Sequence, residues 1–573
     1  MWPFIKLRKA AEESLACEKK YRVAILGDTA TQLLSTCLRG ELYLGNQNAE
    51  VFDADYNQIL PLSLDSASEL YLFHPDYIVL YPSVEVLYSQ FQMCDPVKRE
   101  SFASLEHDKW VNILNSIQSN CKAKIILFNY IERNDMVFGS YALNIPSSFL
   151  YQVKKLNMLM MEETSLGFSL LDINSIATEY GYSNLHTDSI YDLSTLAINT
   201  NFLPMVSSRL KDRILSMRGI VYKCIILDLD NTLWGGVIGD DGIEQIQIGE
   251  LGAGRAFLRF QKWLKELSYR GILLAVCSKN NLETAQEPFL KLKEMALRLE
   301  DFSIFVANWN DKASNIRLIQ HGLNIGFDSM VFVDDNPFER GLVKSQLPEV
   351  LVPDMPKDPS EYVSYLQSLN LFEASSYSAE DRMRTRQYRE EARRRTTMEE
   401  CSSIEEFLTS LHMVSEFSPF QPIYFSRIAQ LSQRSNQFNL RTIRYTFEDI
   451  ERIAKDENYL TMQFSLKDDF GDSGLISFLI LRKRESALFI DTWIMSCRVL
   501  KRTMEEFVIN ELVKEAEKLK FEKIVGEYIP TKKNSMVKDI YPRMGFASEG
   551  ENLYSLEVKK YKKQKTYIEG ERK

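Results

Sequence analysis

The sequence predicts an α/β protein built from three to five domains. Three observations carry this prediction. The chain has 573 residues, more than one hydrophobic core accommodates. Short apolar runs alternate with segments that carry apolar residues at helical spacing, in residues 20–215 and again from residue 222 onward. In residues 406–560, by contrast, strand-like runs come first and helices are interleaved later, which is typical of an α+β domain.

The first block, residues 1–215, alternates expected strands and helices in the order of a mostly parallel sheet covered by helices. The expected strands are 21–26, 76–81 and 123–130, and the clearest helices are 30–44 and 102–120.

The second block, residues 218–355, begins with the continuous apolar run 222–227, which is typical of a buried parallel strand. The expected elements that follow are helix 252–270, strand 272–277, helix 282–298, strand 303–306, helix 311–321 and strand 329–333.

Residues 356–405 are expected to form a charged helical linker. Four arginines fall on one face of its helix, namely Arg382, Arg386, Arg389 and Arg393. A solvated connecting helix is the favoured interpretation, and a docking face for an acidic partner is the alternative. After the third domain, 406–560, the polar tail 561–573 is expected to be frayed.

Composition excludes several classes of protein. A formal net charge of −10 disfavours a protein that coats nucleic acid, which needs a dominant basic surface. The eight cysteines are scattered without a Cys-x-x-Cys pair, so no zinc or redox motif of that kind is present, and a reducing compartment is favoured. No apolar stretch is long enough for a membrane span or a signal peptide. We therefore expect a cytoplasmic protein without nucleic-acid or membrane partners.

The strongest chemical signal is a pair of carboxylates, Asp228 and Asp230, directly after the apolar run 222–227. Two acids this close repel each other unless a cation lies between them, so a hard metal such as Mg²⁺ is expected. One carboxylate can then attack phosphorus while the other moves a proton. Taken alone, the same spacing is equally typical of a turn.

Three later features strengthen the phosphoryl interpretation. Ser278 follows strand 272–277, Lys312 opens a helix, and Asp334 and Asp335 follow strand 329–333. Because ligands bind at the carboxyl ends of parallel strands, we expect these side chains to converge on one edge of one sheet.

The order of these features resembles that of the haloacid dehalogenase (HAD) superfamily. The segments 228–242, 277–281, 308–312 and 331–340 resemble its FkbH-like family, of the subfamily IIIC phosphatase-like type. The resemblance implies a central Rossmann-like HAD domain flanked by an N-terminal SGNH/flavodoxin-like α/β domain and a C-terminal GNAT-like (acetyltransferase-like) α+β domain. The intervals between Thr232, Ser278 and Lys312 are too short for a large cap domain. An uncapped site suits a large or protein-borne substrate, unless neighbouring domains supply a lid.

The resemblance also implies a role for each site residue. Asp228 would be the nucleophile that forms an aspartyl-phosphate, and Asp230 the general acid/base with a backbone carbonyl on the metal. Ser278 would bond the phosphoryl oxygens, and Lys312 would neutralise developing charge. Asp334 and Asp335 would complete the Mg²⁺ site. The substrate-binding candidates are Asn231, Thr232 and Asn280.

The N-terminal block is similar to SGNH-type esterases only in part. Residues 25–30 resemble their nucleophile block, with Thr29 where a serine stands. The expected Asp-x-x-His pair is missing, because His186 is followed by Asp188 rather than preceded by an aspartate. A binding or structural domain is therefore expected instead of an active esterase.

The C-terminal block resembles an acetyltransferase whose phosphate-binding turn lacks its glycines, so ordinary acetyl-CoA binding is not expected. Arg498, Lys501 and Arg502 are candidates to hold phosphate, such as that of a phosphopantetheine arm. Cys497, beside these cations, is the first candidate for an enzyme thioester, and Cys277 the second. For both cysteines, the role of a small buried hydrophobic residue is favoured over the thioester.

FkbH-like enzymes are understood to take a phosphoglyceryl unit from 1,3-bisphosphoglycerate, remove phosphate and load the glyceryl group onto an acyl carrier protein. The resemblance implies this activity here. Two alternatives stay open: a stand-alone phosphatase for another small phosphorylated metabolite, and a non-catalytic scaffold that binds carrier proteins.

Overall fold

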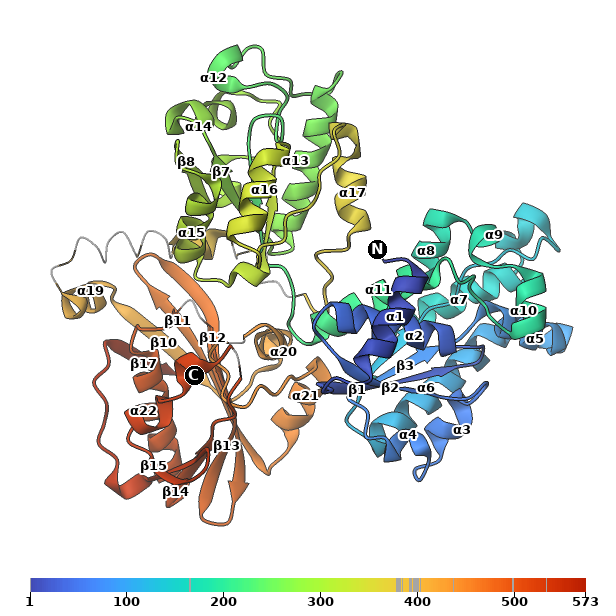
Figure 1. The fold of residues 1–573 in the computed structure, drawn as a ribbon. Coiled ribbons are helices and arrows are strands. Elements are labelled where there is room, and N and C mark those ends of the chain that lie inside the picture. The colour runs from blue at the N-terminus through green and yellow to red at the C-terminus, as the bar shows by residue number, and fades with distance from the viewer. Residues whose placement is uncertain are drawn as a thin grey trace. The chain divides into compact units, whose positions relative to one another are not determined.

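The computed structural model describes residues 2–163, 166–377, 383, 385–390, 394, 401, 403–435, 437–496, 499–531 and 533–573. The chain divides into two compact units, Met1–Leu215 and Ser216–Lys573, and each is described by itself (Figure 1). None of the helices in the described ranges combines the length and the apolar composition that crossing a bilayer requires.

The N-terminal unit is built on a five-stranded parallel sheet of order β2-β1-β3-β4-β5. Its strands are β1 (Tyr21–Gly27), β2 (Ala49–Asp53), β3 (Tyr77–Tyr81), β4 (Lys124–Phe128) and β5 (Phe168–Leu171). Its helices are α1 (Phe4–Ser14), α2 (Gln32–Leu44), α3 (Ile59–Leu64), α4 (Glu69–Leu72), α5 (Val84–Met93), α6 (Phe102–Asn120), α7 (Phe149–Glu162), α8 (Ile173–Tyr180), α9 (Tyr182–Leu185), α10 (Asp188–Ser194) and α11 (Leu203–Met217). Strand β3 is buried throughout, because helices cover both faces of the sheet.

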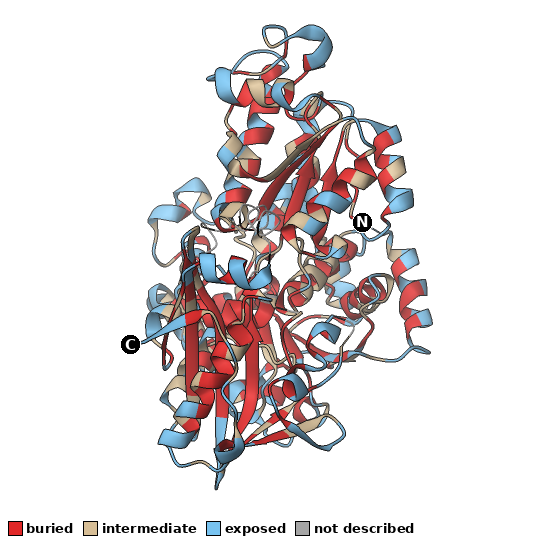
Figure 2. Ribbon diagram, turned by 90° about the vertical axis from the view of Figure 1, so that its left-hand side faces the viewer, coloured by how far each residue is buried: buried red, intermediate tan, exposed pale blue. Residues whose placement is uncertain are grey.

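The second unit begins with a four-stranded parallel sheet of order β8-β7-β6-β9. The strands are β6 (Cys224–Leu227), β7 (Leu273–Ser278), β8 (Phe302–Ala307) and β9 (Met330–Val333). The helices are α12 (Ile238–Asp241), α13 (Gly254–Tyr269), α14 (Leu282–Lys291), α15 (Lys312–Leu323), α16 (Pro337–Gln346) and α17 (Tyr362–Ser368). Alternate residues of β6 enter separate cores, Ile225 one and Ile226 the other, so the sheet is covered on both faces (Figure 2).

The core around this sheet extends past the expected boundary at residue 355. Tyr362 of α17 is buried and packs edge-to-face on Phe257 and Phe260 of α13. Phe372 is buried in the same core. The first part of the predicted charged linker therefore belongs to this domain, because its aromatic side chains complete the core. Of the predicted arginine face, Arg382 and Arg393 lie outside the described residues, and Arg386 pairs with Glu390.

An eight-stranded mixed sheet of order β15-β16-β14-β13-β12-β11-β10-β17 follows. Its strands are β10 (Met413–Ser418), β11 (Tyr459–Asp468), β12 (Gly471–Arg484), β13 (Ala487–Met495), β14 (Lys523–Glu527), β15 (Ala547–Gly550), β16 (Leu553–Glu557) and β17 (Ile568–Arg572). Its helices are α19 (Ile404–Ser410), α20 (Phe425–Arg434), α21 (Phe447–Lys455), α22 (Met504–Lys518) and α23 (Ile540–Arg543).

The expectation of a frayed polar tail over 561–573 is wrong for its last residues. Strand β17 pairs in parallel with β10, with Met413 opposite Ile568. Ile568 is buried, and Gly570 lies so close to Phe507 that an added Cβ would be 2.9 Å from its ring. One apolar anchor and backbone pairing outweigh the polar composition of this segment.

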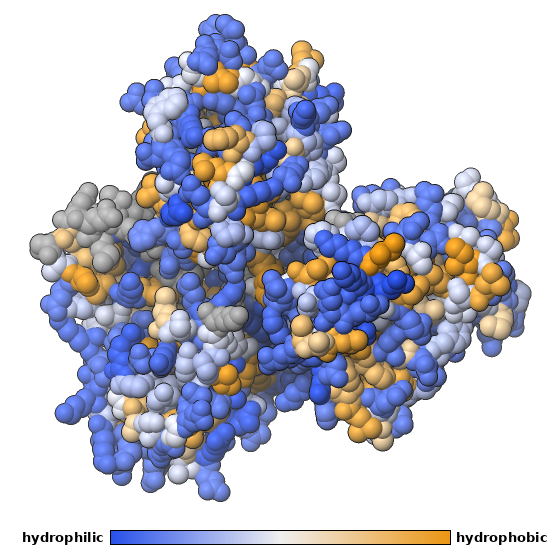
Figure 3. All heavy atoms as spheres, viewed as in Figure 1, coloured by the Kyte–Doolittle hydropathy of each residue, from blue (hydrophilic) through white to orange (hydrophobic). Residues whose placement is uncertain are grey.

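The face of the molecule drawn in Figure 3 is mostly hydrophilic with small apolar patches, as is usual for domain surfaces.

Candidate active site

The carboxyl edge of the four-stranded sheet gathers the side chains predicted to converge there. Asp228 follows the inner strand β6, and Asp334 follows its neighbour β9. Lys312, the first residue of α15, places its Nζ 2.6 Å from Oδ1 of Asp228 and 3.2 Å from Oδ2 of Asp334. The same ammonium donates to the backbone carbonyl of Cys277 at 2.8 Å. A buried lysine is thus fixed between two acids that come from different strands.

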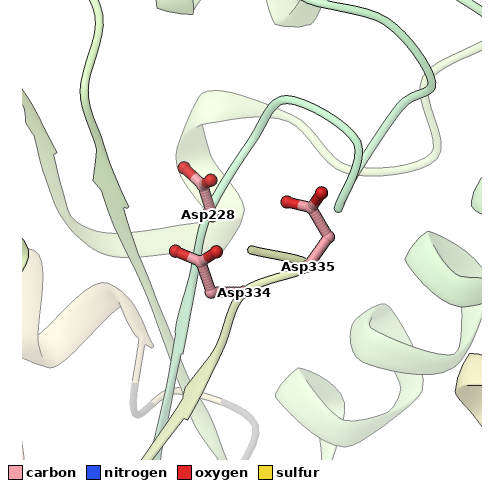
Figure 4. A group of neighbouring side chains, drawn as sticks. All are labelled: Asp228, Asp334 and Asp335. Carbon is pink, nitrogen blue, oxygen red and sulfur yellow. The ribbon is translucent and has the colours of Figure 1, made fainter. Parts of the chain in front are cut away.

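Three carboxylates form the one group among the described residues that could hold a metal ion through His, Cys, Asp or Glu ligands. Asp228, Asp334 and Asp335 each offer an oxygen, and these oxygens all lie within 4.8 Å of one another (Figure 4). Burial, with the charge of Asp228, raises the pKa of Asp334 to about 7 and also raises the pKa of Asp335. Crowded acids with too little positive charge near them are what a hard, oxygen-preferring cation would neutralise. The residues present therefore fit Mg²⁺.

The turn that carries Asp334 and Asp335 is held from both sides. Asn336 donates its backbone N–H to Asp334 Oδ1 at 2.8 Å, and Arg340 donates to the carbonyl oxygens of Asp334 and Asp335 at 2.8 and 2.6 Å. The hydroxyl of Thr232, a buried side chain, accepts from the backbone N–H of Asp335 at 3.2 Å. The loops after β6 and β9 are therefore locked together.

Asp230 belongs to the turn that follows β6 and not to the three-carboxylate group. Its Oδ1 accepts from the Trp234 indole at 2.9 Å and from the Ile238 N–H at 3.1 Å, while Oδ2 accepts from Asn280 at 3.3 Å. Burial raises the pKa of Asp230. A carboxyl that retains a proton more readily than usual, on a rigid support, is suited to general acid catalysis.

The other predicted substrate contacts take part in the same loop geometry. Asn231 has φ +54°, and its side chain accepts from the Gly236 N–H at 2.9 Å. Its carbonyl accepts from the Tyr362 hydroxyl at 3.2 Å. Ser278 ends β7 and is buried. Sequence reasoning missed Tyr362, Arg340 and the indole of Trp234. The sequence places Arg340 on the first turn of the helix that Pro337 opens, but this position does not reveal which groups the side chain contacts.

The predicted thioester and phosphate contacts fare differently. Cys277 is fully buried, and burial raises the pKa of its thiol to about 12, which suppresses the nucleophilic thiolate. Cys497 and Arg498 lie outside the described residues. Lys501 is exposed.

The prediction that Arg502 holds phosphate is not supported by its surroundings. Arg502 is buried, and its Nη1 lies 3.2 Å from Oδ2 of Asp468. The Asp468 carboxylate also accepts two hydrogen bonds of 2.7 Å from Arg394, one at each oxygen. The Asp468 carboxylate therefore neutralises the charge of Arg502 inside the fold, since a buried guanidinium is stabilised by a carboxylate partner.

Known proteins are similar to both the N-terminal unit and the domain that carries this site. Residues 22–215 match the family described as FkbH, N-terminal domain. The solved N-terminal part of the protein BF1531 from Bacteroides fragilis, described as containing a phosphatase domain complexed with Mg, is 43% identical, with a TM-score of 0.62. The match covers 66% of this chain and 100% of that chain.

Weaker similarities involve acetyltransferases. The ribosomal-protein-S18-alanine N-acetyltransferase of Escherichia coli is 12% identical over 25% of this chain and 94% of its own, with a TM-score of 0.21. A spermidine N-acetyltransferase variant from Vibrio cholerae is 15% identical over 26% of this chain and 96% of its own, with the same TM-score of 0.21. These scores carry no argument about the C-terminal sheet. No curated protein matches the chain. Because the Bacteroides fragilis relative is covered over its whole length at 43% identity, the chain belongs to the FkbH-like family.

Proposed function

We propose that this protein is a Mg²⁺-dependent phosphatase or phosphotransferase of the HAD type that works through an aspartyl-phosphate on Asp228. The observation that carries the proposal is the contact of 2.6 Å between Asp228 and the buried Lys312, beside the carboxylates of Asp334 and Asp335. The solved relative, described as containing a phosphatase domain complexed with Mg, supports the same chemistry.

In the proposed first step, a carboxylate oxygen of Asp228 attacks the phosphorus of the substrate. The bond from phosphorus to the leaving oxygen breaks, and Asp230 gives its proton to that oxygen. In the second step Asp230 takes a proton from water, whose oxygen attacks phosphorus. The bond to Asp228 then breaks, releasing inorganic phosphate and restoring both carboxyl groups.

The surrounding residues stabilise the charge that builds during these steps. The Lys312 ammonium lies where negative charge accumulates, and the Ser278 hydroxyl at the end of β7 would donate to a phosphoryl oxygen. When bound by Asp228, Asp335 and the carbonyl of Asp230, with Asp334 beside it, Mg²⁺ would supply Lewis-acid neutralisation of the phosphoryl oxygens.

The test is phosphate release from p-nitrophenyl phosphate by the full chain, with Mg²⁺ and after chelation. Asp228→Asn should lower the rate by about a thousandfold or more, since it removes the nucleophile. Asp240→Asn changes an exposed acid in the nearby turn and should leave the rate unchanged. Loss of less than tenfold in Asp228→Asn, or full activity without a divalent ion, would contradict the proposal.

The finer proposal is that the substrate is a phosphoglyceryl compound and that the glyceryl group passes to an acyl carrier protein. It rests on the FkbH-like resemblance. Because Cys277 is buried with a raised pKa, Cys497 is the better thiol for an enzyme-bound glyceryl group. Intact mass after incubation with 1,3-bisphosphoglycerate and a carrier protein tests this. A glyceryl adduct on either protein supports transfer, and phosphate release with no adduct on either limits the activity to that of a phosphatase.

A further inference from the structure

The Asp230 carboxylate is held from a second side by the loop that follows β7. Asn280 in this loop is buried, and its Nδ2 donates to Asp230 Oδ2 at 3.3 Å. The Oδ1 of the same amide accepts the backbone N–H of Asn281 at 2.9 Å. Because one end of an amide only donates and the other only accepts, these two bonds fix which way the Asn280 side chain faces. Its orientation therefore depends on the position of Asn281.

Asn281 lies at the N-cap position of α14 but does not use its side chain to cap that helix. An asparagine at this position usually accepts a hydrogen bond from a backbone N–H of the first helical turn. Here its Oδ1 accepts instead from the indole Nε1 of Trp309, at 3.0 Å. A contact with the next loop thus replaces a contact within the helix, and it fixes the residue whose backbone N–H holds Asn280.

Trp309 is 71% exposed, so its ring gains little from burial. The loop that carries it is nevertheless fixed by the preceding residue. The backbone N–H of Asn308 donates to the carbonyl of Ser278 at 3.2 Å. The Oδ1 of Asn308 accepts from the Asn310 N–H and from Nδ2 of Asn315, both at 2.9 Å. Since Asn315 is a fully buried residue of α15, the exposed indole is attached to a rigid helix.

Helix α15 consequently anchors both acids of the proposed reaction. Its first residue, Lys312, contacts Asp228 directly at 2.6 Å. Asp230 is connected to the same helix through the loop after β7 and the indole of Trp309. A nucleophile and a general acid that act on one phosphate ester must keep a fixed separation, and a common anchor provides it.

We propose that Trp309, acting through Asn281 and Asn280, is a positioning residue that fixes the Asp230 carboxylate for proton transfer to the leaving oxygen. This role rests on the proposed function, because it concerns the same acid in the same reaction. The indole acts through the loop and not by touching the substrate. A hydrogen bond on the surface adds little to stability, so its loss displaces Asp230 without unfolding the chain.

The first test does not depend on activity. The Trp234 indole donates to the other oxygen of Asp230, so its ¹H–¹⁵N resonance in the full chain reports the orientation of that carboxylate. Trp309→Phe and Asn281→Ala should each shift this resonance beyond its linewidth, and the second variant leaves every aromatic ring in place. Trp2→Phe, which changes another exposed tryptophan in the N-terminal unit, should not shift it. A resonance that stays in place in Trp309→Phe would overturn the proposal.

The second test asks whether proton transfer is affected. Phenol is a poorer leaving group than p-nitrophenol, so hydrolysis of phenyl phosphate depends more strongly on the acid. We expect Trp309→Phe to lower kcat/KM by about threefold for p-nitrophenyl phosphate and by about tenfold or more for phenyl phosphate. Its urea midpoint should match that of wild type. Equal losses for the two substrates would contradict the positioning role. An inactive wild-type chain in which the indole resonance still shifts would refute the proposed function and support the contact.

A double variant separates positioning from contact with the substrate. Asn280→Ala alone should lower kcat/KM for phenyl phosphate by about tenfold or more, because it removes the group that touches Asp230. If Trp309 acts through this residue, adding Trp309→Phe to Asn280→Ala should cause no further loss. Losses that multiply would show that the indole acts by another route, and would overturn the proposal.

Discussion

Lys312 is a buried cation whose charge is held by its neighbours. Burial opposes the charge, but Asp228 and Asp334 outweigh it and raise the pKa of the ammonium above its ordinary value. The side chain is therefore positively charged at neutral pH. It balances the acids before a substrate arrives and is already in position when charge develops on a phosphoryl group.

Replacing Lys312 with methionine keeps the volume and removes the charge. We expect Lys312→Met to lower the phosphatase rate by about a hundredfold or more, because charge on the transferring group is no longer balanced. Without metal, the free energy of unfolding should fall by about 3 kcal/mol, because two acids lose their partner. Initial rates and urea titrations measure the two effects.

The control for that variant is Lys344→Met, which breaks an exposed pair with Asp354 and should change neither quantity appreciably. A Lys312→Met protein with the wild-type rate would remove this lysine from the proposed mechanism.

Asp28 makes stability depend on pH in an unusual direction. Its pKa is about 8 in the folded chain against an ordinary 3.8, so between these values the folded state binds more protons than the unfolded state. The contribution is fully present below about pH 4 and is lost as pH rises toward 8. Between pH 5 and 8, the unfolding free energy of the N-terminal unit should therefore fall in wild type relative to Asp28→Asn, by about 1 kcal/mol per pH unit.

Urea titrations of both proteins across this range give the difference directly. Comparing them cancels the titration of the other acids. Parallel curves for the two proteins would mean that Asp28 is ionised in the folded state at neutral pH.

At the scale of elements, the turn over residues 229–238 is a rigid support for Asp230. It depends on Asn231 at φ +54° and Gly236 at φ +96°, a conformation that suits these residue types. A Cβ on Gly236 would lie 2.8 Å from Asp241 Oδ2, so a side chain at this position would also push the Asp241 carboxylate aside. The turn supplies two of the three hydrogen bonds that orient the Asp230 carboxylate, and Asn280 supplies the third.

Trp234→Phe tests this support, because it removes one donor and keeps the aromatic bulk. The hydrogen bond from Trp234 lowers the pKa of Asp230 against the effect of burial, so its loss should raise that pKa further. We expect kcat to fall by about tenfold with little change in KM, and the limb of the pH–rate profile that the Asp230 pKa sets to move to higher pH.

Trp263→Phe is the matched control, since Trp263 of α13 stacks on Phe260 and, among the described residues, forms no hydrogen bond with Asp230. An unshifted pH profile in Trp234→Phe would show that the indole does not tune Asp230.

The elements that could be predicted from the sequence are those with one dominant signal. Continuous apolar runs indicated β1, β3, β6 and β9, and regular helical spacing indicated α6 over the residues that it occupies. Strands β2 and β5 were not predicted, because they are short and only half-buried and so lack a continuous apolar run. Helix α14 ends at Lys291, shortly after Pro288 and before the expected residue 298.

The same limit applies to the site. Acids and a hydroxyl at strand ends can be placed from the sequence, because parallel strands end at a common edge. Arg340 could not be assigned, because its contacts are with backbone carbonyls, which any residue offers. The burial of Arg502 against Asp468 depends on a pairing of distant segments that no local pattern encodes.

At the scale of the whole molecule, the units Met1–Leu215 and Ser216–Lys573 have separate sheets and cores. We expect calorimetry to resolve at least two unfolding transitions, since each core can melt by itself. Mg²⁺ at a hundredfold excess over its Kd should stabilise the transition that includes the carboxylate group by about 2.7 kcal/mol and leave the N-terminal transition unchanged.

Chelation should reverse that shift, and Asp335→Asn should reduce it. An equal effect of Mg²⁺ on both transitions would mean that the ion does not act through Asp228, Asp334 and Asp335.

Strand β17 has a consequence for how copies of this protein meet one another. It forms the outermost strand beside β10, and its outward residues carry mostly charge, including Glu569, Glu571 and Arg572. Charged side chains on an edge strand disfavour pairing with the edge strand of another copy. Deleting Ile568–Arg572 would expose the backbone hydrogen-bonding groups of Met413–Ser418. That strand would then be an unprotected sheet edge on which other copies could aggregate.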